Sequence, residues 1–231
     1  MSMLHALNIA VTFDLVCPWC WIAKRNLDHA LLQIRSDFPK SNVRVRWRGV
    51  QLLPTVPDEG VPFLDFYRNR LGGEGAMRLR QQQVSAMAEQ AGVQINFERI
   101  ETFPNTFKAH RLLDFVGLFG SNAQHMTLLE NLFSAYFSEG RNIGDSKILL
   151  DAASAIGMSA PLMLEIALFL GVGDAPTEAR SQSPAEPRSP PAQFSSVPHI
   201  VINGQQHLFG AESSEDMIRA FSNTLTIEPT P

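Results

Sequence analysis

The sequence predicts an α/β protein whose small sheet is divided by a long helical segment. A strand-like segment, 8–14, precedes a helical segment, 18–38, and a second strand-like segment begins at Asn42. Far downstream, two short strand-like runs flank Asn203-Gly204, the strongest short hairpin signal, and a helical segment follows them. Most residues between these two groups have helical periodicity, so the strands come from the two ends of the chain.

The first helix is expected to begin next to the only two cysteines of the chain, in "DLVCPWCW". Pro18 suits a first helical turn, where its missing N–H is no loss. This places Cys17 at the N-cap and Cys20 one turn into the helix. The apolar residues that define one helix face are Ile22, Ala23, Leu27, Ala30, Leu31 and Ile34.

The second strand-like segment, "NVRVRWRGVQLLP" (42–54), alternates apolar residues with Arg44, Arg46 and Arg48. The arginines are either a nucleic-acid contact or the solvated face of a strand. Because the chain carries a formal net charge of −4, we expect the solvated face and no nucleic-acid partner.

The middle of the chain predicts a series of helices between residues 61 and 170, with Asp145 and Ser159 as N-caps of the last two. Residues 174–196 are rich in proline and poor in apolar residues, which predicts a loop. The expected helices span 75–91, 106–120, 123–137, 146–156 and 161–170.

The chain closes with a helix that Ser213 or Ser214 caps. A β-α-β unit followed much later by β-β-α is the order of a thioredoxin fold with an inserted all-helical domain. The expected division is 1–60 for the first part of the thioredoxin-like domain, 61–173 for the helical domain, 174–196 for the loop and 197–231 for the second part.

Length and composition restrict the function classes. A chain of 231 residues with 45% hydrophobic residues buries a large core without disulfide support. Residues 1–10 lack the features of a signal peptide, and no apolar run reaches the length of a membrane span. We therefore expect a cytoplasmic protein without a membrane partner.

The cysteine pair has three interpretations: a redox site, half of a metal site or a structural staple. A staple is unnecessary at this chain length. A metal site needs two more ligands, and the six histidines show no ligand spacing, so no metal is expected. In a reducing compartment a close pair of this kind is more often catalytic or metal-binding than structural.

The spacing assigns a role to each residue around the pair. A thiol attacks as its thiolate, which a helix N-terminus stabilises, so Cys17 is the expected nucleophile and Cys20 resolves the mixed disulfide. Pro18 stiffens the turn between them. Trp19 either forms an apolar collar for the substrate or packs against its own domain, and Asp14 either relays a proton for Cys20 or forms a local turn.

Three stretches carry a resemblance to a known family: "FDLVCPWCWIAKRNL" (13–27), "PNTFKAHRL" (104–112) and "VPHIVINGQQHLFGAES" (197–213). In this order they resemble the DsbA-like thioredoxin family, in its FrnE-like branch. The resemblance implies a thiol-disulfide oxidoreductase with Cys17 as nucleophile and Cys20 as resolving thiol.

The resemblance also implies that Val197-Pro198 is a cis-proline dipeptide whose backbone pairs with the bound substrate. Residues 174–196 depart from the family, which usually enters this strand from a helix and a short glycine-containing loop. The implied substrate is a thiol or disulfide of a protein or a small molecule. No bound cofactor is expected, and glutathione is a candidate co-substrate.

Two other functions stay open. A glutathione-dependent isomerase or transferase would resemble 2-hydroxychromene-2-carboxylate isomerase and the kappa-class glutathione transferases, which typically carry serine in place of Cys17. In it, the free N–H groups of the helix that starts at Ser213 would hold a glutathione carboxylate. A chaperone-like binding module would use the apolar surface around Trp19. The sequence leaves the oligomeric state open between a monomer and a homodimer.

Overall fold

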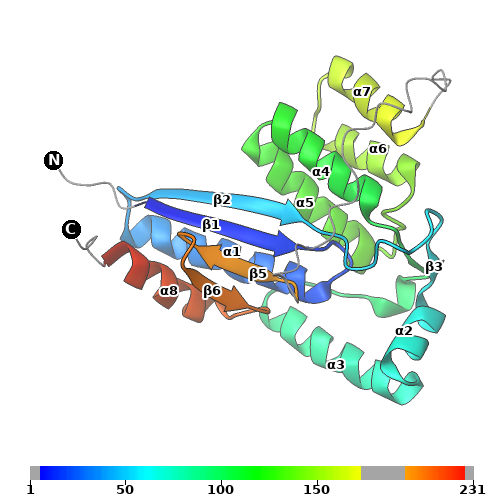
Figure 1. Cartoon of the computed structure of the whole chain (residues 1–231), viewed down its shortest axis with the longest axis horizontal. Helices are drawn as coiled ribbons and strands as arrows, with labels where there is room; N and C mark the ends of the chain where they lie inside the picture. The colour runs from blue at the N-terminus through cyan, green and yellow to red at the C-terminus, as the bar shows by residue number, and fades with distance from the viewer. Residues whose placement is uncertain (1–5, 173–195, 227–231) are drawn as a thin grey trace. The chain divides into compact units, whose positions relative to one another are not determined.

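A computed structural model describes residues 6–172 and 196–226, which form two compact units (Figure 1). The described part of the first unit consists of 6–49, 87–93 and 196–226, and that of the second unit of 50–86 and 94–172. The first stretch of this first unit ends at Gly49, before the expected boundary at residue 60. Residues 87–93 also belong to the first unit. The expected loop, 174–196, lies outside the described residues except for Ser196.

The first unit contains a four-stranded sheet of order β2-β1-β5-β6. Strand β1 (Ala6–Phe13) pairs in parallel with β2 (Asn42–Gly49). It also pairs antiparallel with β5 (His199–Ile202), which forms a hairpin with β6 (Gln206–Phe209). The strands therefore come from both ends of the chain, as the sequence predicts.

Helix α1 (Pro18–Asp37) and helix α8 (Ser214–Thr226) pack on one face of this sheet. The alternation of apolar residues in β1 aims Leu7, Ile9 and Val11 at this core, where each is almost fully buried. Burial of one such side chain stabilises the fold by about 1.5–3 kcal/mol. The opposite face of the sheet carries Asn8 and Ala10, which are exposed.

The β5–β6 hairpin turns at Asn203 and Gly204, which both have positive φ angles, 49° and 73°. Such angles suit the tight hairpin turn that the Asn-Gly pair predicts. The Asn203 side chain also binds β1: its Oδ1 accepts from the Asn8 N–H at 2.8 Å, and its Nδ2 donates to the Ala6 carbonyl at 3.0 Å. One residue therefore forms the turn and attaches the hairpin to the central strand.

The second unit is mostly helical, but it also contains a short antiparallel strand pair, so the expectation of an all-helical domain needs this correction. Phe66 stacks on Phe103 of this pair with ring centroids 4.1 Å apart. Aromatic packing thus accounts for a pair too short to show periodicity. The elements are β3 (Val61–Pro62), α2 (Phe63–Leu71), α3 (Glu74–Gln90, whose last residues belong to the first unit), the 3-10 turn η1 (Phe97–Arg99), β4 (Thr102–Phe103), α4 (Phe107–Phe119), α5 (Asn122–Phe137), α6 (Ser146–Ala155) and α7 (Ala160–Leu170).

Hydrogen bonds of side chains fix the beginning of α6 and the loops before α4. Asp145 caps α6 by accepting from the Lys147 N–H at 2.7 Å, as predicted, whereas Ser159 occupies the N-cap of α7 without a side-chain capping bond. Asn105 joins two loops before α4 because its Oδ1 accepts from Gln51 at 2.9 Å and its Nδ2 donates to the Val56 carbonyl. Among the described helices, none is long and apolar enough to cross a membrane.

Candidate active site

Strand β1 delivers the cysteine pair to the start of α1. After Phe13 the chain turns, and the Cys17 N–H donates to the Asp14 carbonyl at 3.1 Å. Cys17 has the extended conformation of an N-cap residue, with φ −94° and ψ 109°, and Pro18 opens the helix. The predicted positions of Cys17, Pro18 and Cys20 are therefore those of the structure.

At the N-terminus of α1, no side chain of the N-cap residue binds the first backbone N–H groups. The first turn of this helix contains no acidic residue. The N–H groups of a first helical turn carry a partial positive charge and lack intrahelical acceptors. A thiolate at the N-cap position Cys17 is the anion that this end of the helix can stabilise.

The two thiols, both free, differ in their surroundings. Cys17 is 7% exposed and Cys20 1%. Burial raises the pKa of the Cys20 thiol well above its usual value, and the side-chain hydrogen bond with Cys17 and the charge of Cys17 raise it further. The charge of Asp14 acts in the same direction, and a backbone hydrogen bond at Asp14 opposes it. Cys20 is thus held as a protonated thiol while Cys17 is the more accessible one.

A segment far away in the sequence completes the site. The Val197–Pro198 peptide bond is cis, as the family resemblance implies. The Cys17 thiol lies 3.7 Å from the Val197 carbonyl oxygen, to which it donates. Pro198 is anchored in turn, because its carbonyl accepts from the Gly210 N–H at 2.9 Å. The fold therefore brings a backbone carbonyl to the dithiol from 180 residues away.

The remaining predicted residues divide between the site and its surroundings. Asp14 is 1% exposed and electrostatically coupled to Cys20, whereas Trp19 is half-buried at the second position of α1. Ser213 lies at the start of α8, where its Oγ accepts from the Asp216 N–H at 3.1 Å and donates to the Asp216 carboxylate at 2.7 Å. Ser213 is thus the N-cap that the sequence left undecided between Ser213 and Ser214.

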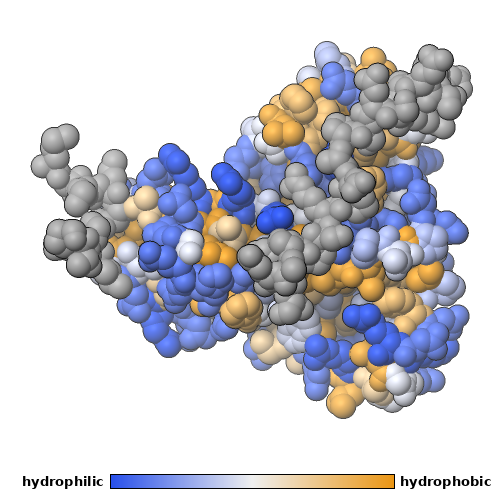
Figure 2. Space-filling model, viewed as in Figure 1, coloured by the Kyte–Doolittle hydropathy of each residue, from blue (hydrophilic) through white to orange (hydrophobic). Residues whose placement is uncertain are grey.

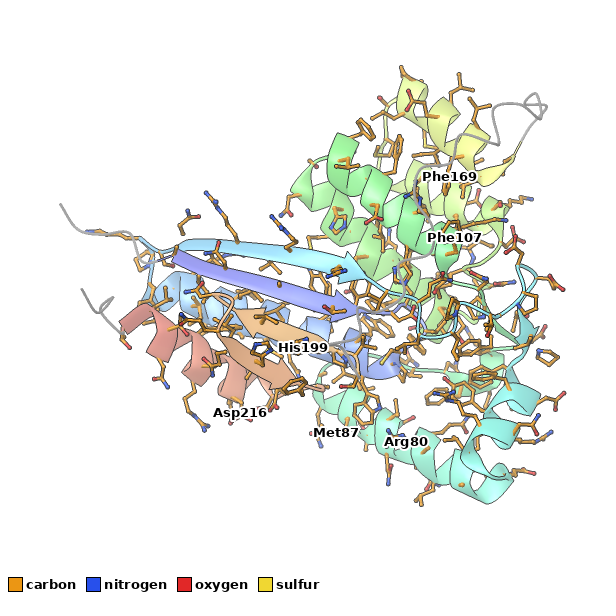
Figure 3. The ribbon with its side chains drawn as sticks, in the orientation of Figure 1. Arg80, Met87, Phe107, Phe169, His199 and Asp216 are labelled. Atoms are coloured by element: carbon orange, nitrogen blue, oxygen red, sulfur yellow. The ribbon has the colours of Figure 1, made fainter. Side chains whose placement is uncertain are left out.

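Two buried polar side chains near the site, Lys24 and His199, were not among the site residues predicted from the sequence. Lys24 follows Cys20 by one helical turn and pairs with Asp28 at 2.8 Å. His199 follows the cis peptide directly and stacks on Phe209, with ring centroids 4.6 Å apart. Figure 3 labels it on β5. The i, i+4 spacing was a usable signal for Lys24, but no local pattern signals the environment of His199.

His199 forms a pair with His207 of β6, since His199 Nε2 and His207 Nδ1 are 2.9 Å apart. Burial, and then the charge of His207, lowers the pKa of His199. The lowered pKa favours the neutral form of the His199 ring. In the part of the chain that the structure describes, no three His, Cys, Asp or Glu side chains are placed to hold a metal ion.

Comparison with known proteins identifies the family. Residues 8–222 match the family described as DSBA-like thioredoxin domain. The chain belongs to this family. A curated relative, the uncharacterized protein YwbO of Bacillus subtilis, is 28% identical over 151 residues. That match spans 65% of this chain and 66% of YwbO, just under two thirds of its length.

Solved structures support the same fold. A probable DsbA oxidoreductase from Streptomyces coelicolor has a TM-score of 0.78 at 21% identity, over 97% of this chain and 92% of its own. The cytosolic disulfide reductase DsbM from Pseudomonas aeruginosa, solved with GSH, has a TM-score of 0.56 at 17% identity, over 94% and 98%. A 2-hydroxychromene-2-carboxylate isomerase has a TM-score of 0.53 at 12% identity, over 94% and 93%. The chain thus has the predicted thioredoxin fold.

Proposed function

We propose that this protein is a dithiol-disulfide oxidoreductase that uses Cys17 and Cys20. The observation that carries the proposal is Cys17 at the uncapped N-terminus of α1, with the Val197 carbonyl 3.7 Å from its thiol. An open helix end favours a thiolate, and an adjacent backbone carbonyl is a hydrogen-bond acceptor for an extended substrate.

The reaction begins when the Cys17 thiolate attacks one sulfur of a substrate disulfide. A Cys17–substrate disulfide forms, and the other substrate sulfur leaves as a thiolate that takes up a proton. Cys20 then loses its proton and attacks the Cys17 sulfur. This step forms the Cys17–Cys20 disulfide and releases the second substrate thiol. The substrate gains two electrons and two protons, and the reverse sequence oxidises a dithiol.

The raised pKa of Cys20 supports an order in which Cys17 attacks first and Cys20 second. Two of the causes that raise the pKa of Cys20 are the hydrogen bond with Cys17 and the charge of Cys17. Both disappear once the Cys17 sulfur is bound in a neutral mixed disulfide, so the pKa of Cys20 falls when the resolving attack is needed. Cys20 therefore does not compete with Cys17 for the first attack.

Replacement of the cysteines tests the proposal. Cys17→Ser should reduce insulin-disulfide reduction to the uncatalysed rate, because serine at neutral pH is not an effective nucleophile toward disulfides. Cys20→Ser should retain the first attack and accumulate a covalent Cys17–substrate adduct, visible by mass spectrometry under non-reducing conditions. An unchanged rate in Cys17→Ser, or no adduct in Cys20→Ser, would contradict the assignment of nucleophile and resolver.

Glutathione is proposed as the co-substrate that returns the oxidised pair to the dithiol, in a cytoplasmic setting. The support is the related cytosolic disulfide reductase that was solved with GSH. Two glutathione molecules would supply the two electrons and form glutathione disulfide. Turnover of insulin with glutathione as the only reductant should be catalytic, and glutathione-independent turnover with a dithiol would point to another reductant.

The isomerase or transferase alternative rests on the fold shared with 2-hydroxychromene-2-carboxylate isomerase. It needs an anion site at the start of α8, where Glu215 and Asp216 already place two carboxylates in the first turn. These charges disfavour a bound glutathione carboxylate. For the chaperone-like alternative, the Cys17→Ser/Cys20→Ser variant decides: continued suppression of client aggregation without any thiol exchange would support it.

A further inference from the structure

The sheet of the first unit has one face that its helices α1 and α8 do not cover. Figure 1 looks onto this face, with both helices behind the strands. Strand alternation and register assign its residues, because Asn8 pairs with Arg44, and Ala10 pairs with both Arg46 and Val201. We call this surface the arginine face and define it by Asn8, Ala10, Arg44, Arg46, Val201 and His207.

The strands that form the arginine face carry basic side chains and no acidic ones. Strands β1, β2, β5 and β6 contain three arginines and no aspartate or glutamate, although the whole chain has a net charge of −4. Arg44 and Arg46 are exposed and form no ion pair with any residue that the structure describes. Figure 2 shows hydrophilic residues along β2 in the same view. Among the described residues, no ion pair therefore compensates the charge of Arg44 and Arg46.

The arginine face leads toward the dithiol. Strands β1 and β2 are parallel, so both run toward the end of the sheet at which Cys17 follows β1. Arg46 is three residues and Arg44 five residues before the last residue of β2. At about 3.3 Å per residue these positions are roughly 10 and 17 Å from the end of the strand. A fully extended peptide of about five residues is long enough to span roughly 17 Å.

We propose that the arginine face docks an acidic, extended segment of the protein substrate whose cysteine or disulfide reacts at Cys17. The inference rests on the proposed function and names a substrate class for it. Complementary charges raise the association rate and favour one class of partner over others, and their effect falls with salt. Carboxylates several residues from the reacting cysteine would lie over Arg46 and Arg44.

The exposed edge strand supports a polypeptide as the occupant. β2, which carries Arg44 and Arg46, is an edge strand of the sheet, and β6 is the opposite edge. The backbone of an edge strand suits an extended peptide. A nucleic acid, in contrast, would meet a protein of net negative charge with one basic strand.

The test uses two peptides that carry the same single cysteine as a mixed disulfide with a chromogenic thiol. Both sides of the cysteine are flanked by glutamates in one peptide and by glutamines in the other. The measurement is the second-order rate constant with the reduced full-length protein. We expect a roughly three- to tenfold preference for the acidic peptide at low ionic strength, which disappears at about 0.5 M salt.

Matched variants assign the preference to the arginine face. In Arg44→Gln/Arg46→Gln the ratio of the two rate constants should fall to about one. Arg35→Gln/Lys40→Gln removes the same charge from exposed positions outside the sheet, and it should retain the wild-type ratio. Thermal unfolding of both variants checks that the fold is intact.

The other outcomes contradict either the proposed function or the docking inference alone. No reaction with either peptide contradicts the proposed function itself. Reaction without an acidic preference, or a preference that persists in Arg44→Gln/Arg46→Gln, overturns the docking inference and leaves the proposed function standing. Binding of a labelled single-stranded oligonucleotide that Arg44→Gln/Arg46→Gln abolishes, together with equal peptide rates, would assign the face to nucleic acid instead.

Discussion

The two helices that cover the sheet, α1 and α8, differ at their N-termini. Helix α1 begins at Cys17 with no side-chain cap and no acidic residue in its first turn. Helix α8 begins with Ser213, whose hydroxyl accepts from the Asp216 N–H, and has Glu215 and Asp216 in its first turn. The first end is available to an anion, whereas the second is already occupied by its own side chains. Of these two N-termini, the uncapped one of α1 is therefore the one that can stabilise a thiolate.

The largest effect on exchange should come from a carboxylate added at the uncapped N-terminus of α1. Trp19→Glu places a carboxylate in the first turn, where it competes with the Cys17 thiolate for the same N–H groups and repels it. The pH profile of the first attack should move to higher pH, with a rate up to about tenfold lower on its acid side. Stopped-flow rates with a chromogenic disulfide measure this.

Trp19→Gln is the matched control, because it removes the same indole without adding charge. The comparison of the two variants isolates the carboxylate from the loss of the ring. Equal pH profiles for Trp19→Glu and Trp19→Gln would show that the first turn of α1 does not control the thiolate at Cys17.

A smaller effect is expected from a substitution that changes the charge near the buried thiol of Cys20. Because the charge of Asp14 contributes to the raised pKa of Cys20, Asp14→Asn should lower that pKa and move the pH profile of the resolving step to lower pH. Decay of a preformed Cys17–substrate disulfide reports this step alone. A slower decay at every pH would instead assign Asp14 the proton-relay role.

The smallest effect on exchange is expected at the capped end of α8. Ser213→Ala removes the cap and should lower the free energy of unfolding by about 1 kcal/mol, with no change in the exchange rate. Ser214→Ala, one residue into the helix, should change stability less. Urea unfolding and the insulin assay together measure both quantities. A loss of exchange activity in Ser213→Ala at full stability would give Ser213 a role in the site.

The sequence was sufficient for features that depend on local rules. The strand–cysteine–helix order, Pro18 at the first helical position and the Asn203-Gly204 hairpin all appear where periodicity and turn chemistry place them. The β3–β4 pair was missed because two-residue strands have no periodicity, and aromatic packing around Phe103 accounts for them. The loop expected at 174–196 stays a prediction, because all of it except Ser196 lies outside the described residues.

The sequence by itself determined the dithiol and the open helix end, because both depend on residues within one turn of each other. Only the tertiary structure decided what surrounds them. It put the Val197 carbonyl against Cys17, buried Cys20 and Asp14, and aligned Arg44 and Arg46 with the neighbouring strands in one basic face. The physical reason is that burial and charge environment depend on strand pairing between segments almost 200 residues apart, which no local pattern encodes.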